Sequence, residues 1–142
     1  MKSNLLLIVV IIILVLVIWF AAGPRSYYTE VGTNPILHRI HKKFQALNPE
    51  YGKVPLRAGD SAYTTNKSEI TICTHDPDTK TPYKECVLDY VAFHELSHMI
   101  SADYGHGPEF SRNFGTVLRA AVEKGLYDPN CVIPSNYCGI NN

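Results

Sequence analysis

The residues best suited to chemistry lie in the run His94-Glu95-Leu96-Ser97-His98, which is an H-E-x-x-H motif inside a segment with helical periodicity. Residues four apart lie on one face of a helix, so both imidazoles can reach a single metal ion at about 2.0–2.1 Å. Glu95 points partly aside from that face and can contact a water on the metal without occupying a coordination position. We therefore predict a zinc site with His94 and His98 as ligands and Glu95 as the catalytic base.

A catalytic zinc site needs a third protein ligand and leaves its fourth position to water. The predicted third ligand is His106, which follows a glycine and precedes a Gly-Pro pair, so that the chain can turn back over the first helix. Asp103 and Glu109 are the alternatives. Asp103 is close to the end of the first helix, and Glu109 falls in the first turn of the next, where a carboxylate also complements the helix dipole. The predicted cofactor is one Zn²⁺ per chain.

Other titratable side chains are given structural interpretations. His38 and His41 fall in a basic helix, and His75 lies beside a turn, so none of the three is predicted to be a ligand. A donor to the developing oxyanion could come from Tyr104 or Tyr137, with packing as the alternative for each of the nine tyrosines.

Three helices and a small sheet are predicted to position the site. The first helix starts at Asn34-Pro35, an N-cap followed by proline at the first helical position, and stops at Asn48-Pro49. The second covers about residues 85–101, and the third begins near Pro108, with Gly125 as its C′ residue. Short apolar segments separated by turns in residues 53–74 predict a small, mostly antiparallel sheet. The predicted fold class is α+β.

The first 22 residues differ from the rest of the chain. Leu5 to Ala22 is an unbroken apolar run, and eighteen helical residues span roughly 27 Å, close to the hydrocarbon thickness of a bilayer. We predict an uncleaved transmembrane helix that contacts the lipid membrane. A cleaved signal peptide is the alternative, but its apolar region would be shorter, and Pro24 follows the small residues needed for cleavage.

The predicted organisation is therefore a transmembrane anchor at 1–22, a linker at 23–33 and a metallopeptidase-like domain at 34–142. The charges that flank the anchor favour an exoplasmic or lumenal domain, and a virion membrane is a further option. In such a compartment the four cysteines, at positions 73, 86, 131 and 138, could form two disulfides. In the cytosol they would be small buried apolar residues. The sequence leaves this choice open.

The charge balance excludes one class of partner. The chain has 13 basic and 13 acidic side chains and a formal net charge of +0, so it lacks the electrostatic footprint of a nucleic-acid-binding protein. The predicted partner is a protein or peptide substrate.

The motif His-Glu-Leu-Ser-His, followed by His-Gly-Pro-Glu-Phe at 106–110, resembles the SprT-like and WLM-type zinc metallopeptidases. Segments at 61–64, 70–73 and 136–139 extend the similarity to small metallopeptidase-like proteins of large DNA viruses. The resemblance implies a zincin-like minimal domain, a three-histidine zinc site and peptide-bond hydrolysis. The chain departs from the metzincin pattern, because Ser101 stands in place of its glycine and no methionine follows to make a Met-turn.

The expected function is that of a membrane-anchored zinc metallopeptidase, which hydrolyses peptide bonds through a zinc-activated water with Glu95 as general base. The alternative is a catalytically silent, zinc-containing structural or virion membrane protein, against which the intact Glu95 argues. An extended substrate could pair with the strand around Ile70-Thr71-Ile72 by strand addition.

Overall fold

The computed structural model describes the elements of residues 2–22, 30–138 and 140–141, and the side chains of residues 7–18 and 30–138. The predicted linker therefore lies largely outside the described residues, at 23–29. Residues 30–33 are helical, and Val31 is buried in the core of the domain.

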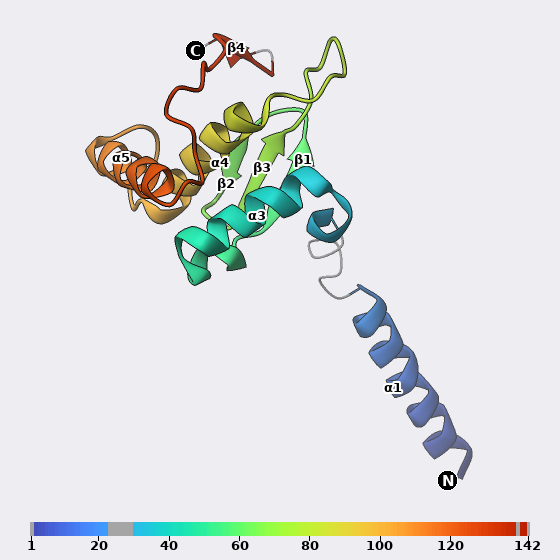
Figure 1. Cartoon of the computed structure of the whole chain (residues 1–142). Coiled ribbons are helices and arrows are strands. Elements are labelled where there is room, and N and C mark those ends of the chain that lie inside the picture. The colour runs from blue at the N-terminus through green and yellow to red at the C-terminus, as the bar shows by residue number, and fades with distance from the viewer. Residues whose placement is uncertain (1, 23–29, 139, 142) are drawn as a thin grey trace.

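Helix α1 (Lys2–Ala22) lies apart from the domain, and its described side chains at 7–18 are exposed (Figure 1). Among the residues that the structure describes, no helix is both long enough and apolar enough to cross a membrane. The predicted transmembrane helix at 5–22, and the single-pass anchored localisation derived from it, are therefore wrong.

Helix α3 (Pro35–Leu47) begins and ends where its capping residues predict. The Asn34 side chain accepts hydrogen bonds from the backbone N–H groups of Ile36 (3.0 Å) and Leu37 (3.2 Å), which would otherwise lack partners. Asn48 ends the helix and caps the short 3₁₀ helix η1 (Pro49–Lys53) that follows.

The sheet has three strands, β1 (Leu56–Gly59), β2 (Tyr63–Thr65) and β3 (Glu69–Cys73), in the order β1-β3-β2. β2 runs antiparallel to β3, but β1 runs parallel to it, so the sheet is mixed instead of mostly antiparallel. The chain crosses from one edge to the other after β1 and returns to the centre as β3. Two very short strands, β4 (Asn136–Tyr137) and β5 (Ile140–Asn141), form a separate antiparallel pair.

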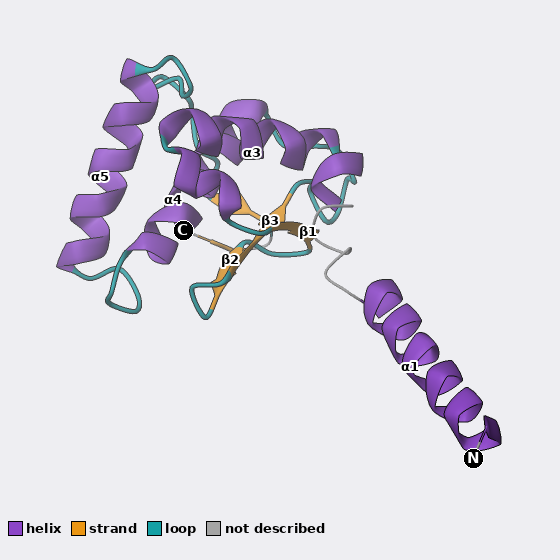
Figure 2. Cartoon of the chain, turned by 90° about the horizontal axis from the view of Figure 1, so that it is seen from below, coloured by secondary structure: helices purple, strands orange, loops and turns teal. Residues whose placement is uncertain are grey.

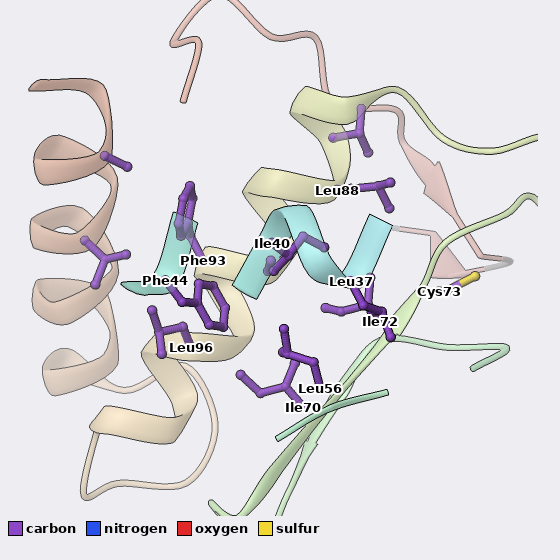
Figure 3. Close-up of a cluster of buried hydrophobic side chains, with 14 of the residues drawn as sticks. Leu37, Ile40, Phe44, Leu56, Ile70, Ile72, Cys73, Leu88, Phe93 and Leu96 are labelled. Atoms are coloured by element: carbon purple, nitrogen blue, oxygen red, sulfur yellow. The ribbon is translucent and has the colours of Figure 1, made fainter. Parts of the chain in front are cut away.

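Helices α3 and α4 (Glu85–Ile100) cover one face of the sheet, and α5 (Pro108–Glu123) packs against α4 (Figures 1 and 2). The core between these layers is drawn in Figure 3. Its largest fully buried apolar side chains come from α3, α4 and strands β1 and β3: Leu37, Ile40, Phe44, Leu56, Ile70, Ile72, Leu88, Phe93 and Leu96. The fold class is thus α+β, as predicted, apart from the transmembrane helix.

Ion pairs to Asp89 and the disulfide of Cys86 hold α4 in addition to apolar packing. The carboxylate of Asp89, which is 3% exposed, accepts hydrogen bonds from Arg39 (2.5 Å) and Lys43 (2.7 Å) of α3. The cysteines form two disulfides, Cys73–Cys138 and Cys86–Cys131, and none of the described cysteines is free. The choice that the sequence left open is therefore answered in favour of disulfides.

Candidate metal centre

The two motif histidines lie on one face of α4. One turn separates them, and their Nε2 atoms are 3.2 Å apart. Both are half-buried, because α5 covers this part of α4. The helix therefore presents two imidazole nitrogens to one point, as the i, i+4 spacing predicts.

His106 joins them from the loop between α4 and α5. The loop starts at Ser101, which is in an extended conformation, and reverses at Gly105, whose φ of +83° is readily adopted only by glycine. His106 Nε2 then lies 3.0 Å from Nε2 of His94 and 3.2 Å from that of His98. The structure thus brings together all three histidines that the sequence singled out.

The triangle of nitrogen atoms fits a metal ion better than it fits hydrogen bonding. Each neutral imidazole Nε2 either carries a proton or offers a lone pair, so three mutually adjacent Nε2 atoms cannot all be paired with one another. A tetrahedral Zn²⁺ at about 2.0–2.1 Å from each nitrogen would set these atoms about 3.3 Å apart. The observed separations of 3.0–3.2 Å are close to that value, so the donor set and spacing fit zinc.

An aromatic side chain from α5 supports all three rings. Phe110 is 4% exposed and stacks on His98, with ring centroids 4.2 Å apart. Its ring also contacts those of His94 at 4.9 Å and His106 at 4.8 Å. Because Phe110 offers no polar atom, it fixes the ring positions without competing for the ligand nitrogens.

Burial keeps the helix histidines in the neutral form that binds metal. The pKa of His94 falls to about 4, mainly because the ring is desolvated and secondarily because His98 and His106 are close. Desolvation and the neighbouring His106 lower the pKa of His98 as well. Both rings can therefore offer a lone pair near neutral pH.

Glu95 lies beside this cluster, and a residue of the sheet binds its carboxylate. Its side chain is 7% exposed, and Oε2 accepts a hydrogen bond of 2.8 Å from the hydroxyl of Thr64 on β2. Burial raises the pKa of Glu95, and the Thr64 hydrogen bond opposes part of that rise. A buried carboxylate with a raised pKa is a better proton acceptor than an exposed one.

The three histidines and Glu95 line one open cavity of about 430 Å³ between the edge strand β2 and α4. Its remaining wall comes from β2, the turn after it, the α4–α5 loop and the C-terminal segment. Aromatic side chains on that wall are Tyr63, Tyr90, Tyr104 and Tyr137. The cavity thus offers both polar and apolar surface next to the histidines.

The alternative ligands do not join the cluster. Among the described residues, the group able to hold a metal contains the three histidines and no carboxylate. Asp103 lines the cavity, with a buried Oδ1 that has no hydrogen-bond partner, and Glu109 lies in the first turn of α5. His41 and His75 instead contact Gly52 O and Thr74 Oγ1, each at 2.8 Å.

The two tyrosines considered as oxyanion donors differ in their surroundings. The Tyr137 hydroxyl donates to the backbone oxygen of Cys73 at 2.5 Å and is buried, so its proton is already engaged. Burial raises the pKa of Tyr137 far above its usual range. Tyr104 is 82% exposed at the rim of the cavity.

Sequence reasoning missed two side chains that organise the centre, Thr64 and Lys67. Thr64 donates to Glu95, and Lys67 donates to the backbone oxygen of Asp103 in the loop after α4. Neither belongs to a recognisable motif. Thr64 is the last residue of the Ser-Ala-Tyr-Thr segment at 61–64, and that segment is the one signal the sequence offers.

Fold and site together define an α+β domain with a three-histidine centre and an adjacent buried carboxylate. The chain is similar to the uncharacterized protein 042R of Invertebrate iridescent virus 3, with 38% identity over 79 residues. It is also similar to the uncharacterized protein 136R of Invertebrate iridescent virus 6, with 30% identity over 112 residues. These matches cover 56% and 73% of this chain, but the chain spans only 50% and 63% of the length of the two viral relatives. No protein-family model matches the chain, and no solved structure does.

Proposed function

We propose that the chain is a zinc-dependent metallopeptidase. The observation that carries the proposal is the convergence of three Nε2 atoms within 3.2 Å, next to the buried carboxylate of Glu95 in the same cavity. His94, His98 and His106 would hold the ion. When bound, Zn²⁺ supplies a Lewis acid that polarises a peptide carbonyl and lowers the pKa of a bound water toward about 7.

Glu95 performs the proton transfers in this mechanism. Its carboxylate accepts the proton of the attacking water, and the resulting carboxylic acid gives that proton to the leaving amine nitrogen as the C–N bond breaks. Glu95 therefore ends the cycle ionised, as it began. The hydrogen bond from Thr64 holds one carboxylate oxygen, Oε2, in place.

The same features favour catalysis over a silent metal site. Burying a carboxylate is unfavourable unless it gains partners, and a purely structural three-histidine site does not need one. Glu95 is nevertheless 7% exposed beside the ligands. Buried acids with a perturbed pKa cluster at functional sites.

The proposed substrate is an extended stretch of polypeptide that lies along β2. The strand around residues 70–72, which the sequence suggested for this role, is β3, and it is already paired on both sides. β2 is at the edge of the sheet, and Tyr63 and Thr64 on it line the cavity. Strand addition there would carry a peptide past the histidines.

The test is cleavage of a labelled, unfolded protein such as casein by the zinc-loaded chain and by its Glu95→Gln variant. We expect the variant to lose activity by about 10²–10⁴-fold, the range for removal of a general base, with zinc still bound. A variant as active as the unmodified chain would overturn the role of Glu95. Zinc binding without cleavage by either protein would favour the silent alternative.

A further inference from the structure

Lys67 occupies a backbone conformation that lysine rarely adopts. It lies with Asn66 in the tight turn between β2 and β3, which is closed by a 2.8 Å hydrogen bond from Ser68 N to Thr65 O. Asn66 has a φ of +45° and Lys67 a φ of +54°, both in the left-handed region. A side chain there costs roughly 1 kcal/mol relative to glycine, so some other interaction must hold Lys67 in place.

That interaction is made by the Lys67 ammonium group with the end of α4. Nζ donates to the backbone oxygen of Asp103 at 2.9 Å, makes a close contact with that of Ser101, and lies 3.5 Å from that of His98. The last carbonyls of a helix lack partners within the helix, and a cation complements the negative end of its dipole. Lys67 therefore contacts the last turn of α4 and binds the segment that leaves it, across 31 to 36 residues of sequence.

The carbonyl groups that Lys67 contacts belong to the segment that leads from His98 toward His106. Its Nζ also lies 4.9 Å from the ring centroid of Tyr104, a cation–π contact with the middle of the loop. The carboxylate of Asp103 packs so closely over Gly107 that a Cβ at position 107 would lie 2.2 Å from its Oδ2. Asp103 thus packs directly against Gly107, the residue that follows His106.

We propose that Lys67 is the positioning residue for the third metal ligand, and that it sets the Ser101–Gly107 loop so that His106 reaches the two helix histidines. The proposal rests on the metal site of the proposed function, but it does not depend on peptide cleavage. The same turn continues β2, which carries Thr64. One short hairpin therefore sets both the orientation of Glu95 and the path of the loop that carries His106.

A positioning role and a purely electrostatic role of Lys67 predict opposite changes in zinc affinity when its side chain is removed. A nearby ammonium repels a bound cation, so its removal alone would tighten zinc binding. If Lys67 holds the loop, its removal weakens zinc binding, because His106 must then be ordered when the metal binds. Loss of an outer partner of a metal ligand typically costs 10–100-fold in affinity.

The test compares Lys67→Gly with Asn66→Gly in the full chain, by competition titration of Zn²⁺ against a chelator. Glycine suits a positive φ at either position, so both variants keep the turn, but only the first loses the ammonium. We expect Kd for Zn²⁺ to rise by about 10–100-fold in Lys67→Gly and to stay unchanged in Asn66→Gly. An unchanged or lower Kd in Lys67→Gly would overturn the proposal.

A spectroscopic and a coupling measurement separate positioning from a general effect on folding. The visible spectrum of bound Co²⁺ reports the ligand set, and Lys67→Gly should shift it toward the spectrum of His106→Ala. In a His106→Ala background, adding Lys67→Gly should change Kd for the metal little, because the ligand that it positions is already gone. Equal losses in both backgrounds would contradict the proposal. Absence of metal binding in the unmodified chain would instead overturn the proposed function.

Discussion

The hydroxyl oxygen of Thr64 lies 2.8 Å from Oε2 of Glu95 and 3.0 Å from the backbone oxygen of the same residue. One hydroxyl proton serves one acceptor at a time, but both acceptors belong to Glu95. The edge strand β2 is therefore tied to the residue of α4 that is proposed to move protons. This contact fixes the position of the Glu95 carboxylate relative to strand β2, which forms one wall of the cavity.

Replacing Thr64 by valine should lower catalysis without removing the metal. The valine keeps the branched shape but cannot donate to Glu95, so the carboxylate loses its orientation. We expect kcat to fall by about 10-fold, less than the 10²–10⁴-fold attributed to general-base catalysis as a whole, with one zinc per chain retained. Steady-state kinetics with a peptide substrate and metal analysis would measure the two effects. Thr64→Ser restores the hydroxyl and should recover most of the rate; an inactive serine variant would argue against this role.

The metal-free domain should lose stability as the pH falls. The pKa of His94 is about 4 in the folded protein, below the ordinary value of about 6.5 for an unfolded chain. Between these values the unfolded state binds more protons, so the free energy of unfolding decreases as pH drops from about 6.5 toward 4. Because the ring is partly exposed, we expect a contribution of about 1 kcal/mol.

Urea unfolding of the metal-free protein at several pH values would measure this slope. A His94→Gln variant should show a shallower dependence over the same range. If both proteins lost stability equally, the dependence would have another origin.

Asp89→Ala should be the most destabilising of the charge substitutions on α4. It would leave the ammonium of Lys43 and the guanidinium of Arg39 partly buried without the carboxylate that lies 2.5–2.7 Å away. Breaking such a pair costs about 3–5 kcal/mol. Glu85 is a matched control, because it contacts the same two cations at 3.0–3.3 Å but is 62% exposed.

Glu85→Ala should therefore cost no more than about 1 kcal/mol. Chemical unfolding of both variants would provide the comparison. Equal losses in the two would mean that burial of Asp89 does not decide the energetics.

The two disulfides should differ in their effect on the cavity. Cys73–Cys138 closes 65 residues and Cys86–Cys131 closes 45, so removal of either should lower stability by about 2–4 kcal/mol. Only the first adjoins Tyr137, which lines the cavity and bonds Cys73 O. We expect the Cys73→Ser/Cys138→Ser pair to raise KM, and the Cys86→Ser/Cys131→Ser pair to leave it unchanged. A rise in KM for the second pair would contradict this distinction.

The helices and the convergence of the three histidines could be predicted because their signals are local. Asn34-Pro35 and Pro108 fix helix starts through capping and backbone geometry, and the four-residue spacing of His94 and His98 fixes their common face. His106 followed from the same logic, since the glycines around it permit the chain to return.

The parts that the sequence did not predict depend on contacts between distant segments. The parallel pairing of β1 with β3 leaves no pattern in such short strands. Lys67 contacts α4 only because the β2–β3 turn comes to its end, and Asp89 is buried only because α3 supplies two cations. The membrane prediction at 5–22 relied mainly on apolar length, and no described helix supports it.

Metal content is the measurement that tests the central claim most directly. Zinc should be determined in the purified full chain, prepared under conditions that keep both disulfides, and in the Glu95→Gln and His106→Ala variants. The account predicts one zinc per chain in the unmodified and Glu95→Gln proteins, and a large loss of affinity in His106→Ala. Absence of zinc from the unmodified chain at neutral pH, or full retention in His106→Ala, would contradict the three-histidine centre.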